Sequence, residues 1–427
     1  MIKHLKMINV GPAASLELEF GKRLNLLTGD NGLGKSFLLD IVWWSLTRKW
    51  PAEINTDLTA GKKAQPAPEG EAKISFTFSS KSKEESYDSS YLRKEAAWTG
   101  RSGRPANPGL VLYAMSDGSF ALWDPCRNYW RTQDGLDVQD RAPAYVFSPA
   151  QVWDGLPGKG NTWLCNGLVR DWAGWQKEKG APLKHLKEVL KVLSPSNKET
   201  LEPGDLTRIS LDDVRDMPTI RMPYQQQGVP VVHASSGMRR IMALAYFLVW
   251  AWEEHKQAAK QLGEPPTKQI TFLIDEIESH LHPSWQRSIV PALLSVMEKL
   301  TKNAEVQLIT ATHSPLIMAS VEPLFDIEQD AWFDLDFERK KVVLRRRDFE
   351  KHGDAATWLV SEAFDLKSSR SLEYERLIDE ASALLEKTEP VNSQIEKMNG
   401  KLVQALGPKD AFLFNWRYIC KQKGWLK

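Results

Sequence analysis

The chain has 427 residues, with 56 lysines and arginines against 55 aspartates and glutamates. This length predicts more than one structural lobe. The balanced charge argues against a strongly basic nucleic-acid-binding protein, although a local basic groove is still compatible with it. Hydrophobic residues make up 42% and charged residues 26%, which is typical of a globular chain and excludes a disordered one.

Cysteine usage and hydropathy indicate the compartment. Cys126, Cys165 and Cys420 lie far apart, which excludes a disulfide framework and a paired-cysteine metal site. The longest apolar stretch, residues 241–252, is well short of the ~20 residues that a membrane-spanning helix needs. We therefore expect a cytoplasmic protein that makes no membrane contact.

In chain order, residues 2–20 predict two strands, because Leu16, Leu18 and Phe20 alternate with polar residues. A short apolar strand over 23–28 is followed by a glycine-rich turn and a helix over 36–50. A polar stretch over 51–109 contains a strand at 72–78. Further strands are expected over 110–130, around a turn at 116–119 (SDGS), and over 143–147.

The second half of the chain alternates helices and buried strands. Helices are expected over 162–179, 182–192, 238–255 and 283–299, a hairpin over 218–232, and buried strands over 270–274 and 306–311. A hairpin over 332–345, amphipathic helices over 371–385 and 392–406, and an aromatic tail follow.

The strongest motif is a phosphate-binding loop between the strand over 23–28 and the following helix. Residues 29–36 read GDNGLGKS and match G-x-x-x-x-G-K-[ST]. Glycines let backbone N–H groups turn toward phosphate oxygens, and the helix N-terminus adds positive potential. Lys35 is predicted to reach the β- and γ-phosphates, and the Ser36 hydroxyl to ligate Mg²⁺. The predicted nucleotide contacts of this segment are Gly29, Asn31, Gly32, Gly34, Lys35, Ser36 and Phe37.

A second motif is an apolar strand that ends in two carboxylates, at residues 271–276 (TFLIDE). Alone this pattern is weak, because many buried strands end in acidic residues. Beside an intact P-loop it is a Walker B motif, in which Asp275 holds Mg²⁺ and Glu276 orients and deprotonates the attacking water.

The long helix expected from residue 238 follows the sequence Ala234-Ser235-Ser236-Gly237. The two serines can cap this helix. The same geometry offers a hydroxyl and the Gly237 N–H group to an anion. Capping and phosphate binding are compatible, so both interpretations stay open at this point.

The order of these motifs discriminates between P-loop families. The P-loop and the Walker B strand are far apart in the sequence. The serine–glycine helix start comes shortly before the Walker B strand. This arrangement resembles the ABC-type ATPases, specifically their soluble SMC/RecF/OLD branch, whose LSGGQ signature corresponds to residues 234–238. Ser-Ser-Gly is common in that branch, so Met238 is the departure that affects a contacting side chain.

The resemblance implies further site residues. Residues 311–315 (ATHSP) look like the switch-histidine loop, and residues 278–283 (ESHLHP) look like the D-loop, which disfavours a metal site at His280 and His282. Gln151 is the best Q-loop candidate, contacting Mg²⁺ and the attacking water. The implied sets are catalytic Lys35, Glu276 and His313; magnesium-binding Ser36, Asp275 and Gln151; an ATP contact by Gln151; and a signature, acting in trans, of Ser235, Ser236 and Gly237.

The resemblance also implies an α/β fold of the ABC type, with a mixed sheet and flanking helices, an antiparallel β subdomain, a helical lobe and a helical C-terminal tail. We expect residues 1–150 to form an ATPase lobe with the P-loop and a β-rich insertion, and residues 151–237 a helical lobe leading to the signature. Residues 238–325 are expected to hold the Walker B strand, D-loop and switch histidine, and residues 326–427 a β-hairpin and helical region.

ATPases of this branch dimerise head-to-tail around ATP. We expect neither their long coiled coil nor a zinc hook nor a C-terminal nuclease domain here, since the acidic pair Asp334 and Asp336 falls in a hairpin pattern. What is left resembles the stand-alone ATPases of bacterial phage defence, Septu-type or PARIS-type, which control a separately encoded effector, often a nuclease. The resemblance therefore implies a homodimer or higher homo-oligomer that uses ATP and Mg²⁺ and regulates such a partner.

A RecF-like DNA repair ATPase that binds DNA directly is the alternative. Basic clusters at Arg101 and Arg104, at Arg239 and Arg240, and over 340–347 (KKVVLRRR) are candidates for its contact surface. Alternating charges on a hairpin are more often a solvated face, and the balanced net charge favours the effector-controlling hypothesis. DNA binding by the chain alone, or copurification with an effector, separates the two.

Overall fold

The computed structural model describes residues 1–80, 83–100, 106–128, 141–223, 227–301, 304–387 and 391–426. The chain divides into two compact units, Met1–Gly353 and Asp354–Lys427. The sequence analysis grouped the hairpin near residue 340 with the C-terminal helices, whereas its contacts place it in the first unit, because its first strand pairs with the P-loop strand. The finer division into four segments stays a proposal.

The first unit is built on an eight-stranded sheet in the order β18-β17-β3-β16-β15-β7-β8-β9. Strands β17, β3, β16, β15 and β7 run parallel, and both ends of the sheet are antiparallel. Its strands are β3 (Leu24–Gly29), β7 (Leu110–Ala114), β8 (Phe120–Trp123), β9 (Tyr145–Phe147), β15 (Gln269–Ile274), β16 (Glu305–Ala311), β17 (Ala331–Glu338) and β18 (Lys341–Arg347).

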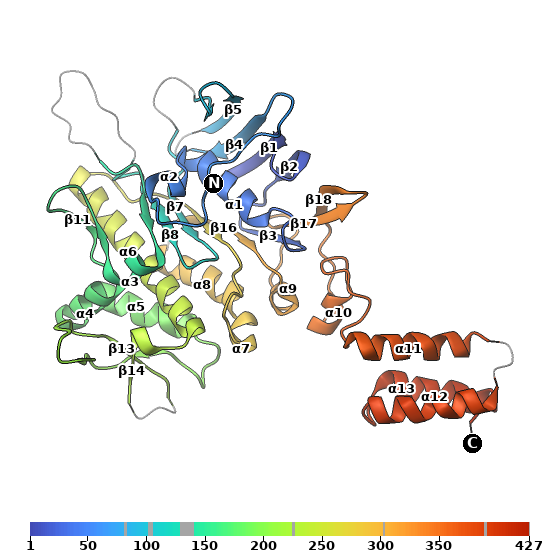
Figure 1. Ribbon diagram of the computed structural model, residues 1–427. Coiled ribbons are helices and arrows are strands. Elements are labelled where there is room, and N and C mark those ends of the chain that lie inside the picture. The colour runs from blue at the N-terminus through green and yellow to red at the C-terminus, as the bar shows by residue number, and fades with distance from the viewer. Residues whose placement is uncertain are drawn as a thin grey trace. The chain divides into compact units, whose positions relative to one another are not determined.

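A second, antiparallel sheet has the order β2-β1-β4-β5-β6. Leu5 pairs with Leu18 on one side and with Phe76 on the other, so the apolar positions of three strands share one buried face. The strands are β1 (Ile2–Val10), β2 (Ala13–Glu19), β4 (Lys73–Ser79), β5 (Glu84–Leu92) and β6 (Ala97–Trp98). The antiparallel β subdomain expected from the resemblance is therefore present (Figure 1).

Helix α1 (Lys35–Thr47) packs between the two sheets. Leu39, Val42 and Trp43 are all at most 1% exposed, and Trp44 stacks on Trp50 just before the short helix α2 (Pro51–Ile54). A helix that is apolar on all sides has to be covered on all sides. The P-loop helix is therefore held rigidly against both sheets.

The helical lobe gathers at the end of the unit away from β4 and β5 (Figure 1). It contains α3 (Pro149–Asp154), β10 (Leu156–Pro157), β11 (Trp163–Cys165), α4 (Leu168–Glu178), α5 (Ala181–Val192), β12 (Glu202–Pro203), β13 (Thr219–Arg221), β14 (Val229–Pro230) and the 3-10 turn η1 (Val231–His233). The helix predicted from residue 162 begins only at Leu168. A Cβ on Gly167 would lie 2.3 Å from the Gly155 nitrogen, so the chain folds back there before the helix starts.

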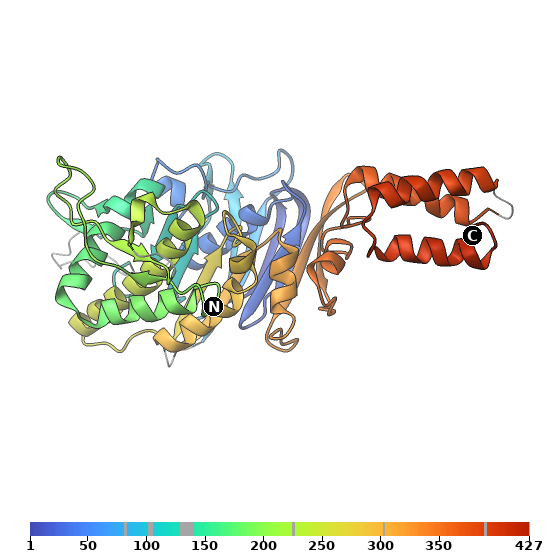
Figure 2. The same ribbon diagram turned by 90° about the horizontal axis from the view of Figure 1, so that it is seen from below.

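The remaining helices of the first unit cover the core sheet. They are α6 (Ser236–Leu262), α7 (Pro283–Gln286), α8 (Ile289–Thr301) and α9 (Pro315–Val321). The single helix predicted over 283–299 is thus two helices, and the helix predicted over 238–255 is longer than expected. Figure 2, which is seen from below, shows α8 and α9 beside the core strands.

The second unit contains α10 (Ala355–Leu359), α11 (Leu372–Leu385), α12 (Asn392–Ala405) and α13 (Ala411–Gln422). The aromatic tail is helical because Asp410 caps α13 by accepting hydrogen bonds from the Phe412 and Leu413 amides. Trp416 and Leu402 are fully buried in the small core between these helices. Among the described residues, no helix is long and apolar enough to cross a membrane.

A buried glutamine links the core sheet to the antiparallel sheet of the first unit. Gln307 of β16 is 1% exposed, and its Oε1 accepts a hydrogen bond of 2.9 Å from the Ile2 amide. Its Nε2 donates to the carbonyls of Ile2 and Gly21, at 2.8 Å and 2.7 Å. The amide therefore satisfies three main-chain groups where β1 meets the core sheet.

We expect Gln307→Leu to destabilise the protein, because it removes the side chain that bonds the buried Ile2 amide and carbonyl, while the Gly21 carbonyl keeps its hydrogen bond from Asn25. An unsatisfied buried group costs about 1–3 kcal/mol, so the free energy of unfolding should fall by at least about 2 kcal/mol. Urea unfolding followed by tryptophan fluorescence measures this. Gln257→Leu, on the exposed side of α6, is the matched control, and an equal loss in both variants would contradict the assignment.

Candidate functional site

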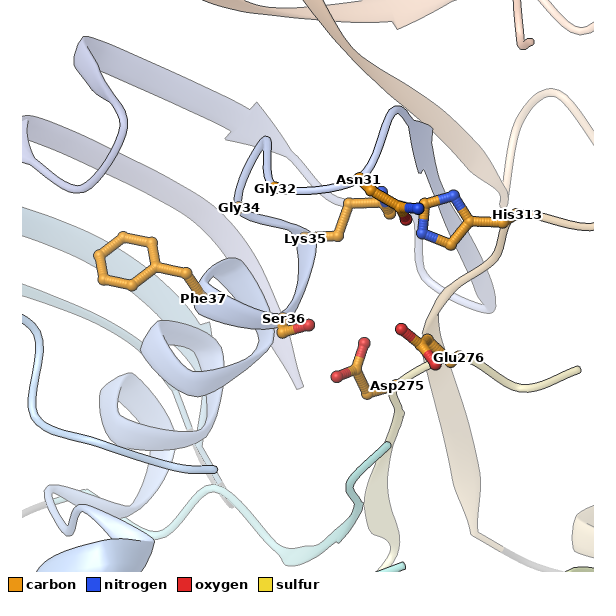
Figure 3. Close-up of a pocket in the computed structure, with 9 residues that line it drawn as sticks. All are labelled: Asn31, Gly32, Gly34, Lys35, Ser36, Phe37, Asp275, Glu276 and His313. Atoms are coloured by element: carbon orange, nitrogen blue, oxygen red, sulfur yellow. The ribbon is translucent and has the colours of Figure 1, made fainter. Parts of the chain in front are cut away.

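The three nucleotide-binding segments meet at one edge of the core sheet. β16 lies between β3 and β15, and all three run parallel, so the P-loop, the switch loop and the Walker B carboxylates follow neighbouring strand ends. Together they border a cavity of about 290 Å³ (Figure 3). Its lining residues are Asn31, Gly32, Gly34, Lys35, Ser36, Phe37, Asp275, Glu276 and His313.

The P-loop has the backbone that its glycines allow. Gly29 has φ 122°, and a Cβ there would lie 2.1 Å from the Leu335 carbonyl oxygen on β17, so only glycine fits. Gly29 itself does not line the cavity, but its carbonyl accepts a hydrogen bond of 2.7 Å from Lys35 Nζ. Lys35 Nζ also donates to the Asp30 carbonyl at 2.8 Å. The ammonium is thus held across the loop, at the place where phosphates bind in P-loop proteins.

The Walker B aspartate is buried beside Ser36. Asp275 is 2% exposed, and its carboxylate faces the Ser36 hydroxyl (Figure 3). Burial raises the pKa of Asp275, and the hydroxyls of Ser36 and Ser116 partly offset this rise. Within the described part of the chain, Asp275 Oδ1 is buried without a hydrogen-bond partner. An unpartnered carboxylate oxygen next to a serine hydroxyl fits Mg²⁺, which prefers oxygen ligands.

Glu276 follows Asp275 in a strained backbone conformation. Its φ of 46° lies in the left-handed region, which costs a non-glycine residue of order 1–3 kcal/mol and is found at functional sites. The turn directs the Glu276 side chain into the cavity, opposite His313 (Figure 3).

His313 is held from behind by Glu278. The Glu278 carboxylate accepts hydrogen bonds from the His313 amide and, at 2.8 Å, from the Thr312 hydroxyl. Burial lowers the pKa of His313, and the Lys35 ammonium lowers it further, so the imidazole is mostly neutral at pH 7. The D-loop residue Glu278 was assigned no contact from the sequence, yet it fixes the switch loop.

The signature residues lie outside the cavity of their own chain. Ser235 caps α6 by accepting a hydrogen bond of 3.3 Å from the Met238 amide, so the capping interpretation is confirmed. Ser235 and Ser236 are exposed, whereas Gly237 is buried against the D-loop, where a Cβ would lie 2.6 Å from the His280 carbonyl oxygen.

The structure does not bring Gln151 to the cavity. Its Oε1 accepts hydrogen bonds from the Ser148 amide at 2.9 Å and from Asn55 Nδ2 at 2.7 Å, as part of the capping box of α3. Gln151 follows β9, the last strand of the sheet, whereas β7 is the strand beside β15. The turn after β7 instead brings Ser116 against Asp275. From the sequence, residues 116–119 are predicted only as a turn between strands, since the strand order is not visible in a local pattern.

A family model described as "AAA domain, putative AbiEii toxin, Type IV TA system" matches residues 24–319, the segment that supplies every residue of the cavity. The chain belongs to this family. Its mixed sheet, with the P-loop and Walker B residues at neighbouring strand ends, agrees with the α/β fold that the resemblance in the sequence implied.

Curated relatives of this AAA-domain chain include a retron probable ATPase and a Septu protein. The retron Ec83 probable ATPase of E. coli is 29% identical over 154 residues, which are 36% of this chain and 26% of that protein. Septu protein PtuA of Bacillus thuringiensis is 23% identical over 340 residues, which are 78% of this chain and 77% of that protein. The match therefore spans only about a quarter of the retron protein.

Similar solved structures include an SMC head domain and a recombination mediator protein. The SMC head domain from Thermotoga maritima has a TM-score of 0.40 and 14% identity, covering 81% of this chain and 99% of that chain. The recombination mediator protein RecF with ATP has a TM-score of 0.38 and 16% identity, covering 81% and 97%.

Two arginines of the basic hairpin in this AAA-domain chain pair with acidic residues of the same hairpin. Arg345 pairs with Asp336 and Glu338 across β17 and β18, and Arg347 pairs with Asp334 at 3.0 Å. Asp334 also accepts a hydrogen bond of 2.8 Å from the Thr28 hydroxyl. The acidic pair of the hairpin is thus used in structural contacts.

The other basic clusters differ in exposure. Arg239 is exposed on α6, but its neighbour Arg240 is only 7% exposed and contacts main-chain carbonyls. Arg240 is therefore not available to a DNA backbone. Arg101 and Arg104 lie outside the described residues.

One group elsewhere in the described chain has the composition of a metal site, namely Asp124, Cys126 and His255. Its imidazole is already used on both sides, because Nδ1 hydrogen-bonds Asp124 at 2.8 Å and Nε2 accepts from the Thr267 amide at 2.8 Å. Asp124 also accepts from Arg127 and from the Cys126 amide. With these partners the cluster works as a buried hydrogen-bonded link between α6 and the end of β8.

We expect ATP binding to depend on pH through Lys35. Burial lowers its pKa to about 8, so the ammonium is mostly charged at pH 7 and loses its proton as the pH rises above 8. Phosphates bind the charged form, and bound ATP should therefore raise this pKa and take up a proton. We expect the ATP affinity to be flat below about pH 7 and to fall by up to about tenfold per pH unit above 8.

Equilibrium titrations with ATP from pH 6.5 to 9.5 check this expectation. Lys35→Arg is the control, because a guanidinium stays charged throughout this range and should remove the pH dependence if it binds. A wild-type affinity that is flat up to pH 9.5 would contradict the role given to Lys35.

Proposed function

We propose that the chain is a regulatory ATPase that dimerises head-to-tail around ATP and controls a separately encoded effector, a nuclease, in phage defence. The observation that carries this proposal is the cavity, where Lys35, Ser36, Asp275, Glu276 and His313 face one another although they come from three separate segments. ATP hydrolysis to ADP and phosphate needs each of these chemical types.

The geometry suggests a role for each group. Lys35 and the P-loop amides bind the phosphates, and Ser36 and Asp275 are placed to hold Mg²⁺, which would neutralise charge on the phosphate oxygens. Glu276 accepts the proton of the attacking water. The neutral His313 imidazole donates a hydrogen bond to the γ-phosphate. These assignments follow from the position of each side chain around the cavity.

We infer dimerisation because the signature serines do not line the cavity of their own chain. Ser235 and Ser236 are exposed at the start of α6 and do not line the cavity of their own chain. A helix N-terminus with exposed hydroxyls is suited to binding phosphate. We infer that it contacts the ATP bound by a second copy, so that ATP stabilises the dimer and hydrolysis releases it.

The effector role rests on the relatives. Septu PtuA aligns with most of this chain, and the retron ATPases align with a part of it. The pairing of Arg345 and Arg347 with carboxylates favours this role over direct DNA binding. Such a system would act in the bacterial cytoplasm.

We expect Glu276→Gln to abolish turnover while preserving ATP binding. Removing a general base costs on the order of 10²–10⁴-fold in rate, whereas the amide keeps the volume of the carboxylate. Phosphate release measures turnover, and sedimentation with ATP and Mg²⁺ should show the variant as a stable dimer. Glu328→Gln, on an exposed loop of the same unit, is the control. Equal turnover in Glu276→Gln and wild type would refute the assigned base.

The Glu276→Gln variant also allows a test of whether the signature contacts ATP bound by a second copy. Adding Ser235→Arg to Glu276→Gln should prevent ATP-dependent dimerisation, because a long side chain replaces the hydroxyl at the helix start. ATP should still bind through the intact P-loop. An unchanged dimer would show that Ser235 does not face the partner's nucleotide.

The effector hypothesis is tested by coexpression of the tagged chain with its genomic neighbours, followed by native mass measurement with ATP and Mg²⁺. A stable complex with a nuclease-like chain is the expected result. A bare dimer that gains mass only when DNA is added would instead support a RecF-like DNA-binding ATPase.

A further inference from the structure

A buried arginine connects the signature helix to the nucleotide site of the same chain. Arg240 lies on α6, five residues after Ser235, and is 7% exposed. Its guanidinium donates to the Met115 carbonyl at 2.7 Å and to the Asp275 carbonyl at 3.2 Å. Met115 directly follows β7 and Asp275 directly follows β15, so Arg240 joins the ends of two neighbouring core strands.

Burying the Arg240 guanidinium costs desolvation free energy, which a residue that only packs the core would not need. Burial disfavours the charge of Arg240 and lowers its pKa, and the described acidic groups that offset this effect are Asp275, Asp117 and Glu276. Its Nε is buried without a hydrogen-bond partner in the described structure. A neutral or apolar side chain of similar volume avoids this desolvation cost. The charge is therefore placed where it faces the carboxylates of the site.

Both acceptors of Arg240 belong to segments that shape the magnesium site. The Met115 carbonyl precedes Ser116, whose hydroxyl contacts the Asp275 carboxylate. The second acceptor is the main chain of Asp275 itself. Through one guanidinium, a shift of α6 therefore acts on the main chain of Asp275 and on the turn that carries Ser116.

The start of α6 also contacts the D-loop through Gly237. Gly237 packs against the His280 carbonyl so closely that no side chain fits between them. The helix cannot move toward the D-loop without displacing the turn that follows Glu278, and Glu278 holds His313. Binding of the partner's ATP to the exposed serines would thus shift the positions of Asp275 and His313 of the same chain.

We propose that Arg240 is a positioning residue that couples signature engagement to the Walker B carboxylate of its own chain, so that ATP in one site of the dimer sets the rate in the other. The inference rests on the proposed head-to-tail dimer and adds a regulation to it. Because each chain has both a signature and a site, the coupling of binding runs in both directions.

Mixed dimers test this coupling. A chain with a working site is combined with an excess of either Glu276→Gln, which holds ATP, or Lys35→Ala, which does not. Phosphate release then comes from the working chain, because neither partner turns over ATP. For the wild-type working chain, we expect at least a fivefold difference in turnover between the two partners.

The working chain is then varied at two neighbouring arginines. Arg240→Met should bring the two rates within twofold of each other, because the link from the signature to Asp275 is lost. Arg239→Met, on the exposed side of α6, is the matched control and should keep the wild-type difference. Arg240→Lys should give a reduced difference, since one ammonium cannot bond both strand ends as the guanidinium does.

Each outcome bears on the inference. If Arg240→Met does not fold, as judged by circular dichroism, Arg240→Lys carries the comparison. A wild-type difference that persists in the folded Arg240 variant, or no difference in the wild type, overturns the coupling. Sedimentation of the same mixtures with ATP shows separately whether dimers form. Absence of dimers there contradicts the proposed function, whereas dimers without coupling contradict only this inference.

Discussion

The parallel pairing of β16 between β3 and β15 determines where every reactive group of the site lies. Its register matches Leu27 with Ala311 and Thr310 with Ile274, so the P-loop, His313 and Asp275 leave the sheet at the same level. Neighbouring strands are about 4.8 Å apart, which sets the ends of β3 and β15 roughly 10 Å apart. That span suits a polyphosphate with a metal ion between the two.

The charges of the site are arranged for a ligand rather than for the stability of the empty protein. Lys35 has main-chain carbonyls as its hydrogen-bond partners, and burial lowers its pKa. Burial raises the pKa of Asp275 and Glu278. Opposite charges that are buried without a direct ion pair are disfavoured, and polyphosphate with a cation would supply the missing partners. Perturbed pKa values of this kind cluster at functional sites.

Local patterns predicted the parts of the site that are contiguous in the chain. The P-loop, the carboxylate pair and the His313 loop each depend on a few neighbouring residues, and the structure brings them to one cavity. Gln151 could not be placed in this way, because a Q-loop position depends on which strand lies beside β15. Ser116 follows that strand, but only the sheet order reveals it. Arg240 appeared to be one of two surface charges, since sequence does not show which side of a long buried helix faces the strand ends.

In the proposed dimer, the start of α6 would contact two nucleotide sites. Ser235 and Ser236 face outward, where a second copy can approach, whereas Gly237 and Arg240 face inward, toward the D-loop and the strand ends. An α-helix places residues on different faces within a single turn, so outward and inward contacts are joined by a rigid backbone. The outward face carries hydroxyls suited to phosphate and the inward face carries the guanidinium. A movement of the outward face of the helix start therefore also moves its inward face.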